Sequence, residues 1–168
     1  MRLVIFICVF LFQLVPHDQD ANSDSCEIYI ISLSRQIEGK NVPVVVKFEY
    51  TMSESLLSGL KSTKLIDSKI LNQLKRNPNP MLNPQTCDNV RSKLIEWKVY
   101  NNANTLDDYV LINMAEPIYT NKSEAYLFFD YLNIKTGRGV AGGASILQIF
   151  CEEDNQWQIK STKILEMY

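Results

Sequence analysis

Histidine is almost absent from this sequence: His17 is the only one among 168 residues. Hydrolases with a serine or cysteine nucleophile need a base beside it, and that base is most often histidine. Compact zinc sites need several cysteine and histidine ligands at short spacing. His17 also lies in a segment that we expect to be removed, so the sequence disfavours both chemistries. We expect no metal and no other cofactor.

An excess of positive charge is missing as well. The chain has 17 basic and 19 acidic residues, which gives a net charge of −2. The densest basic region, from Lys61 to Arg76, is interrupted by Asp67 and contains no aromatic residue on which a base would stack. A solvated helix face explains these lysines, and we expect no nucleic-acid partner.

Glycine is scarce, with six residues in the chain. Four of them fall between positions 137 and 143, but no Lys-Ser or Lys-Thr pair follows at the spacing of a phosphate-binding loop. Gly142 and Gly143, at the start of a predicted strand, favour a β-bulge instead, or close packing of Trp157 or Phe129 over bare backbone.

A long apolar run occurs only at the N-terminus, where Leu3 to Phe12 follow Arg2. Such a run is typical of a secretory signal peptide and is short for a membrane span, which takes about 20 residues. We expect residues 1–21 to be removed, although no Ala-x-Ala pattern fixes the cleavage site. The alternative is an uncleaved N-terminal anchor. Residues 22–168 are then a single domain, secreted or periplasmic, with no stable membrane span.

Three cysteines lie outside the predicted signal peptide: Cys26, Cys87 and Cys151. An exported protein meets an oxidising compartment, so we expect one disulfide, and the sequence leaves open which two of the three form it. The remaining cysteine is either a small buried apolar residue or the link of a covalent dimer. The protein is therefore expected to be a monomer or a disulfide-linked dimer.

The first part of the domain predicts a β-hairpin followed by helices. Residues 27–33 are mostly apolar on both faces of a predicted strand, and residues 44–51 alternate like a half-buried strand. A turn at 38–41 separates them, and Pro43 stands at the start or the edge of the second strand. From Ser53 to Leu74 the apolar residues return at helical spacing, which predicts two short helices or one kinked helix. Val90, Leu94 and Trp97 mark a third helix, with Trp97 as a core anchor.

The second part predicts four antiparallel strands in a meander, at about residues 109–114, 125–132, 141–151 and 157–165. The strand from Ala125 is apolar on both faces, which favours burial on both sides over an exposed aromatic face. The predicted fold class is therefore α+β, with an N-terminal hairpin and two or three helices packed on this meander.

Aromatic residues of the second part suggest a ligand pocket between sheet and helices. Tyr126, Phe128, Tyr131 and Trp157 are the candidates for its lining, and ordinary core packing is the competing explanation. Asp130 and Glu116 are the candidates for catalysis, since two carboxylates held about 5 to 10 Å apart suffice for glycoside hydrolysis. Every domain has carboxylates, so this signal has little specificity.

The last fifty residues resemble a recurring pattern in uncharacterised exported proteins of bacteria, of the Bacteroidetes type. The pattern consists of residues 116–119 (Glu-Pro-Ile-Tyr), the strand from Ala125, Gly142-Gly143, and residues 156–159 (Gln-Trp-Gln-Ile). Ala115 departs from it, because the relatives have a serine there. The resemblance implies an exported α+β domain and no activity. A more distant likeness, to cone-shaped sheets of the nuclear transport factor 2 type, implies a pocket beneath a curved sheet.

Together these observations predict an exported domain that acts by binding an unidentified protein or small ligand, and not by catalysis. The alternative is a small secreted hydrolase that uses Asp130 and Glu116 in the aromatic pocket.

Overall fold

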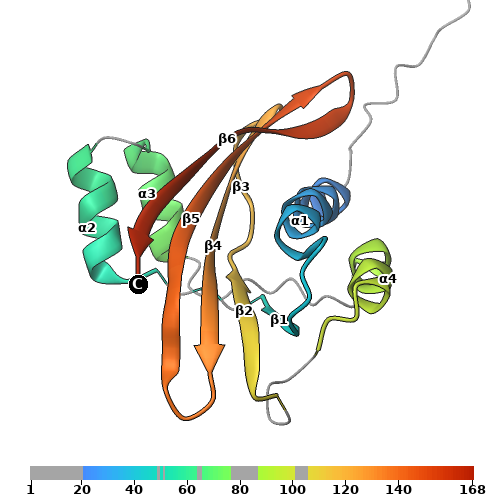
Figure 1. Cartoon of the computed structure of the whole chain (residues 1–168). Coiled ribbons are helices and arrows are strands. Elements are labelled where there is room, and N and C mark those ends of the chain that lie inside the picture. Colours follow the sequence, from blue (N-terminus) through green and yellow to red (C-terminus); the bar gives the residue numbers. More distant parts are fainter. Residues whose placement is uncertain (1–20, 49, 51, 64–65, 77–86, 101–105) are drawn as a thin grey trace, which may run out of the picture.

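The computed structural model describes residues 21–168 except residues 49, 51, 64–65, 77–86 and 101–105 (Figure 1). The described helices are α1 (Ala21–Ile37), α2 (Glu54–Thr63), α3 (Ser68–Arg76) and α4 (Asp88–Glu96). The described strands are β1 (Val44–Lys47), β2 (Asp108–Met114), β3 (Ile118–Asn121), β4 (Glu124–Lys135), β5 (Gly139–Glu153) and β6 (Gln156–Met167). The α+β class is thus confirmed, while residues 1–20 of the predicted signal peptide lie outside the described part.

The predicted N-terminal hairpin is wrong, because residues 27–33 belong to helix α1. The buried residues of α1 recur at helical spacing and form the stripe Ser25, Ile28, Tyr29, Ser32, Leu33 and Ile37. A short, nearly continuous apolar run does not distinguish a buried strand from a buried helix, and here the helix is the correct choice. The predicted hairpin turn is the end of α1, where Gly39 has a φ of 75° and adopts the left-handed conformation that often ends a helix.

Strand β1 is shorter than predicted and has a different partner. It covers Val44–Lys47, directly after Pro43, and pairs in parallel with β2. Parallel pairing requires a long crossover connection, which here carries α2, α3 and α4. The sequence around β1 does not predict this partner, because β1 and β2 are about sixty residues apart in the chain.

The helices predicted between β1 and β2 are confirmed. The apolar spacing after Ser53 corresponds to the two short helices α2 and α3, and the third predicted helix is α4. Trp97 follows α4 directly and is partly buried against the core. None of the described helices is long and apolar enough to cross a membrane.

The sheet is larger than the predicted four-stranded meander. Its strand order is β1-β2-β4-β5-β6, and β3 pairs with β4 beside this path. Strands β2, β4, β5 and β6 are antiparallel neighbours, as expected, but β1 adds a parallel edge and β3 was not predicted. Strand β3 has only four residues and follows directly after Pro117. A segment this short shows little alternation, and a proline beside it argues against a strand.

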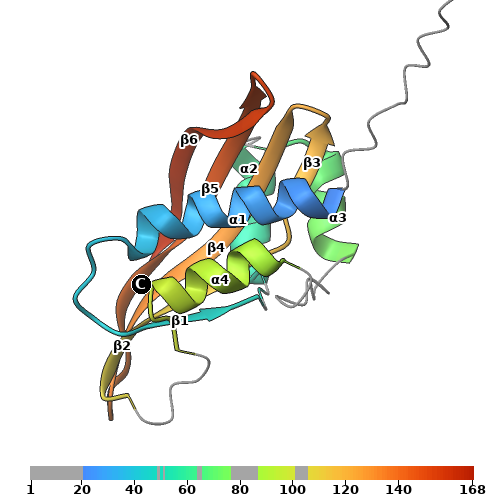
Figure 2. The same ribbon diagram turned by 90° about the vertical axis from the view of Figure 1, so that its right-hand side faces the viewer.

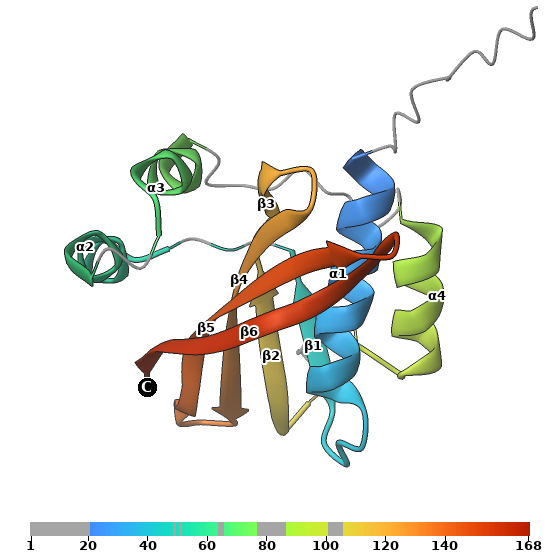
Figure 3. The ribbon, with the colours of Figure 1, turned by 90° about the horizontal axis from the view of Figure 1, so that it is seen from above.

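Helices lie on both faces of this sheet (Figures 2 and 3). Helices α1 and α4 lie on one face, here called the α1 face, and α2 and α3 lie on the other, the α2–α3 face. Each face has its own hydrophobic core. The α1 face buries Ile28, Tyr29, Leu33, Ile112, Leu127, Phe129, Phe150 and others. The α2–α3 face buries Leu56, Leu60, Ile70, Leu71, Phe128, Leu147 and others.

Strand β4 joins the two cores. Leu127 and Phe129 pack in the core of the α1 face, and Phe128 between them packs in the core of the α2–α3 face. All three side chains are fully buried. Burial on both sides, which the sequence favoured over an exposed aromatic face, is therefore confirmed.

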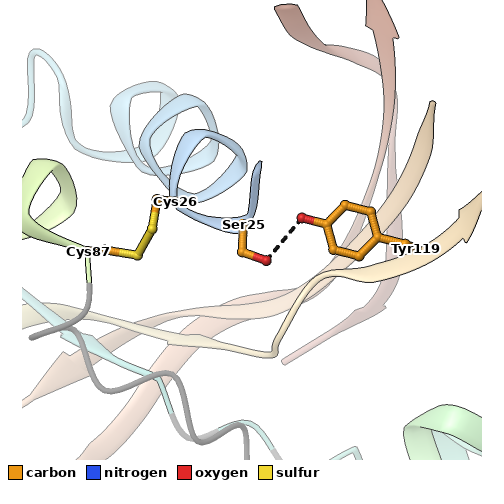
Figure 4. Close-up of a disulfide and its surroundings, with 4 residues drawn as sticks. All are labelled: Ser25, Cys26, Cys87 and Tyr119. Carbon is orange, nitrogen blue, oxygen red and sulfur yellow. Dashed lines mark hydrogen bonds between the residues drawn. A yellow bond between two sulfur atoms is a disulfide. The ribbon is translucent and has the colours of Figure 1, made fainter. Parts of the chain in front are cut away.

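A disulfide between Cys26 and Cys87 attaches α1 to the start of α4, with the two Cα atoms 5.7 Å apart (Figure 4). The hydroxyl of Ser25, the residue directly before Cys26, forms a hydrogen bond of 3.0 Å with the hydroxyl of Tyr119. The predicted disulfide is confirmed and its two partners are now defined. Cys151, on β5, is a free thiol that is partly buried.

We expect the disulfide to contribute strongly to stability. It closes a loop of 61 residues, and the chain-entropy model gives about 4 kcal/mol for such a loop. The double variant Cys26→Ala/Cys87→Ala should therefore lose about 3 kcal/mol of unfolding free energy in a denaturant titration. Cys151→Ala is the control, with a loss below about 1 kcal/mol. Equal losses in the two proteins would contradict this assignment.

Candidate functional site

A row of polar residues crosses five strands on the α2–α3 face. The strand register places Lys47 beside Asn113, Asn113 beside Asp130, Asp130 beside Ser145, and Ser145 beside Glu166. We call these five residues the polar row. Successive side chains of a strand point to opposite faces, and Phe128 and Leu147, two positions from Asp130 and Ser145, face α2 and α3. The polar row therefore lies at the border of the core that these helices cover.

Ser145 connects the polar row to the end of β6. Its Oγ donates a hydrogen bond to Asp130 Oδ1, and the Tyr168 hydroxyl lies 2.8 Å from the same Oγ. A serine hydroxyl has a single hydrogen, so Tyr168 is the donor in the second bond. With 1% of its surface exposed, Ser145 is also the most buried member of the row.

Burial perturbs the acid–base chemistry of this network. Loss of solvent raises the pKa of Asp130 above its ordinary value of 3.8, the hydrogen bond from Ser145 opposes that rise, and the nearby Glu166 carboxylate adds to it. Tyr50 lies in the same surroundings: burial and the Asp130 carboxylate raise its pKa above the ordinary range of tyrosine. Charge on Asp130 and Tyr50 is therefore disfavoured around Ser145.

An apolar surface begins on the other side of the polar row. Leu111 and Leu132 form the next row together with Gly143, and Tyr109, Ile134 and Val140 form the row after that. The alternation of side chains along β2 and β4 puts both rows on the α2–α3 face. Val140 joins them because the bulge at Ala141 in β5 pairs it with Ile134. We call Tyr109, Leu111, Leu132, Ile134 and Val140 the open face. Its side chains are partly exposed, and Val140 is 51% exposed.

The described helices do not cover the open face. Its five residues belong to neither hydrophobic core, and Figure 1 shows β2, β4 and β5 extending beyond the ends of α2 and α3. The face spans three strands, and its outer strands are about 10 Å apart. Its two rows are separated by about 7 Å along the strands.

Gly143 determines how Leu132 lies on this face. A Cβ atom at position 143 would meet the carbonyl oxygen of Tyr131 and would come within 2.9 Å of both Cα and Cδ2 of Leu132. The Leu132 side chain thus rests on bare backbone. Two structural explanations were predicted for Gly142 and Gly143. The β-bulge is confirmed, opposite Asn133 and Ile134. The residue packed closely against Gly143 is Leu132, and not Trp157 or Phe129.

The two predicted catalytic carboxylates lie in different surroundings. Asp130 accepts a hydrogen bond from Ser145 on the α2–α3 face. The Glu116 carboxylate instead contributes to raising the pKa of Tyr29 and Tyr119, which pack on the α1 face. Among the described residues, no group of three or more His, Cys, Asp or Glu side chains is arranged to hold a metal ion. Buried Ser145 is out of reach of a substrate in solution, so its hydroxyl positions Asp130 and Tyr168 and does not act as a nucleophile.

The four predicted aromatic residues divide between the two faces. Tyr126 and Phe128 belong to the core of the α2–α3 face, while Tyr131 and Trp157 belong to that of the α1 face. Phe128 and Trp157 are buried; the Tyr131 ring lies 5.2 Å from Lys40 Nζ, a cation–π distance. Sheet backbone separates the two pairs, so these residues do not line one common pocket.

Sequence reasoning found Asp130 but missed the residues around it. Ser145, Tyr168 and Leu111 reach the site from three other stretches of chain, and only the strand register makes them neighbours of Asp130. Leu132 lies on β4 itself, two residues after Asp130. One signal in the sequence could have indicated the open face. Leu132 and Ile134 alternate with polar residues after the fully apolar part of β4.

Comparisons of the chain with protein-family models, with curated proteins and with solved structures found no match.

The raised pKa of Asp130 makes a prediction about stability. A folded-state pKa above the unfolded value contributes stability that is complete below the unfolded pKa and is lost as pH rises through the folded pKa. Asp130→Asn removes this loss while its amide oxygen still accepts from Ser145. Relative to wild type, the variant should therefore gain unfolding free energy between pH 3 and pH 7. Glu152→Gln, outside the network, should show no such trend; a flat Asp130→Asn difference would refute the assignment.

Gly143→Ala should disturb the open face. The added methyl group overpacks Leu132 and the Tyr131 backbone, a change that costs about 2 kcal/mol of unfolding free energy. Gly142→Ala is the matched control, because both glycines have a φ of 158° and a Cβ at 142 meets only the Tyr168 carbonyl oxygen, at 3.7 Å. Thermal or denaturant unfolding of both variants measures the difference, and equal costs would show that backbone conformation alone requires the glycines.

Proposed function

We propose that residues 22–168 form an exported interaction domain that binds an amphipathic helix of a partner protein on the open face. The observation that supports this most directly is the pair of apolar rows next to the polar row. They continue the α2–α3 face without a described helix above them.

A helix suits this surface because the same face already accepts two. Leu56 and Leu60 of α2 and Ile70 of α3 pack with Phe128 and Leu147 of the sheet. An α-helix with its side chains is about 10 Å wide, similar to the width of the three strands of the open face. A third helix placed there would extend the existing helical layer. Its apolar stripe would lie on Leu111 and Leu132.

The size of the open face sets the expected strength of binding. A stable interface buries about 800 Å² on each partner, and five partly exposed side chains supply only part of that area. A partner helix must therefore also contact the polar row or the β4–β5 turn. We expect a weak, reversible complex, with a dissociation constant in the micromolar range or above.

Export rests on two features. The apolar run from Leu3 behind Arg2 is typical of a signal peptide, and the Cys26–Cys87 bond is of a kind that persists in oxidising compartments. The resemblance to exported Bacteroidetes proteins agrees with this part of the proposal. The likeness to nuclear transport factor 2 supports the proposal in one respect only: such folds have an antiparallel sheet with part of one face free for a ligand.

Two earlier hypotheses stay predictions beside this one. A hydrolase would use Asp130, whose raised pKa suits a general acid, but the proposed interaction does not require turnover. A disulfide-linked dimer would use Cys151, which the Cys26–Cys87 bond leaves free.

A designed peptide tests the open face. An 18-residue peptide with leucines along one helical face and balanced charges elsewhere should shift the methyl NMR signals of Leu111, Leu132 and Val140. A scrambled peptide of the same composition, which has no apolar face, should not. Val140→Glu should weaken binding about tenfold, because it places a charge against the apolar stripe of the peptide.

Ile95→Glu is the matched control for this experiment. Ile95 is 69% exposed on α4, on the opposite side of the sheet, so its substitution should leave peptide binding unchanged. Equal weakening by both variants, or unmoved methyl signals of the open face, would reject the proposal.

A further inference from the structure

A second feature, separate from the open face, lies between α2 and α3. A cleft of about 530 Å³ there is lined by four residues of α2 and three of α3. They are Glu54, Leu57, Ser58, Lys61, Ser68, Leu71 and Asn72. This volume is within the range of small-molecule sites, about 300 to 1,000 Å³.

The spacing of the lining residues shows that two helix faces form the cleft. On α2 they recur at intervals of three or four residues from Glu54 to Lys61, and on α3 from Ser68 to Asn72. Residues at these intervals share one face of a helix. Leu57, partly buried, and Leu71, buried, give the cleft an apolar part, and two serines and an asparagine add hydrogen-bonding groups.

Opposite charges stand at the two ends of the α2 wall. Glu54 and Lys61 are seven residues apart, which separates them by about 10 Å along the helix axis. That is too far for a direct ion pair. A ligand with one positive and one negative end about 10 Å apart would pair with both, and its middle would lie against Leu57 and Leu71.

We propose that this cleft binds a short zwitterionic peptide of about three residues. An extended tripeptide spans about 10 Å, so its terminal ammonium reaches Glu54 while its terminal carboxylate reaches Lys61. Its central side chain lies on the two leucines. Ser58, Ser68 and Asn72 donate to or accept from its peptide groups, the polar contacts that fix orientation in such sites.

This inference does not depend on the proposed partner helix. The cleft is made by side chains of α2 and α3, whereas the open face consists of residues of β2, β4 and β5. Failure of one proposal leaves the other intact.

The probe is the tripeptide Ala-Leu-Ala with free termini, titrated into the full-length protein and followed by methyl NMR. We expect saturable shifts of the Leu57 and Leu71 signals. The N-acetylated and the C-amidated peptides each lose one charge and should bind about threefold to fivefold more weakly, as is usual for an exposed ion pair. The dipeptide Leu-Ala, about 7 Å long, spans only one of the two charges and should also bind more weakly.

Two surface variants assign each end of the peptide. Glu54→Gln should remove the discrimination against the acetylated peptide and retain that against the amidated one, and Lys61→Gln should do the reverse. Lys69→Gln, on α3 but outside the cleft lining, is the control and should change neither ratio. All three positions are exposed, so circular dichroism should show folded proteins. The proposal is overturned if the leucine signals do not move, or if blocked and free peptides bind equally well.

Discussion

The rest of the structure depends on β4, a strand whose first half is buried on both faces and whose second half is partly or fully exposed. Residues 125–129 are apolar without alternation, so helices must cover both sides of the sheet there. The helical cover of the α2–α3 face ends at Asp130, and from Leu132 onward apolar and polar residues alternate. The polar row and the open face follow from that change within one strand.

The sequence was sufficient for β4, β5 and β6 because the signals there are local. Strands β4, β5 and β6 follow one another through short turns, so their alternation and the intervening turn residues predict both the strands and their antiparallel pairing. The first half depends on distant contacts. Strand β1 pairs with β2 across three helices, and no local pattern records such a partner. Residues 28–31 of helix α1 were mistaken for a strand because they form one apolar run. The helix packs on the sheet there, so this stretch has no polar residues to reveal the helical period.

The candidate site was predictable only as far as single residues stood out. Asp130 did, as an acidic residue within an aromatic strand. Its partners Ser145 and Glu166 are ordinary residues of later strands, and two β-bulges between β5 and β6 determine which residues of β6 lie beside β5. The four predicted aromatic residues are divided between the two faces for a related reason. Tyr126 and Phe128 differ in parity from Tyr131 along β4, so they face opposite sides of the sheet.

The disulfide holds a helix that covers an unfavourable feature of the α1 face. The side chains of Ser32, Gln148 and Trp157 are buried on that face, and their hydroxyl, amide and indole groups have no hydrogen-bond partner among the described residues. Each such group costs about 1 to 3 kcal/mol relative to a paired one. The Cys26–Cys87 bond contributes about 4 kcal/mol, a value of the same order, and it acts on the helix that covers these groups. Without the disulfide, α1 would be held by packing and a few hydrogen bonds alone, so the docking of this helix is the part of the fold that depends most on the bond.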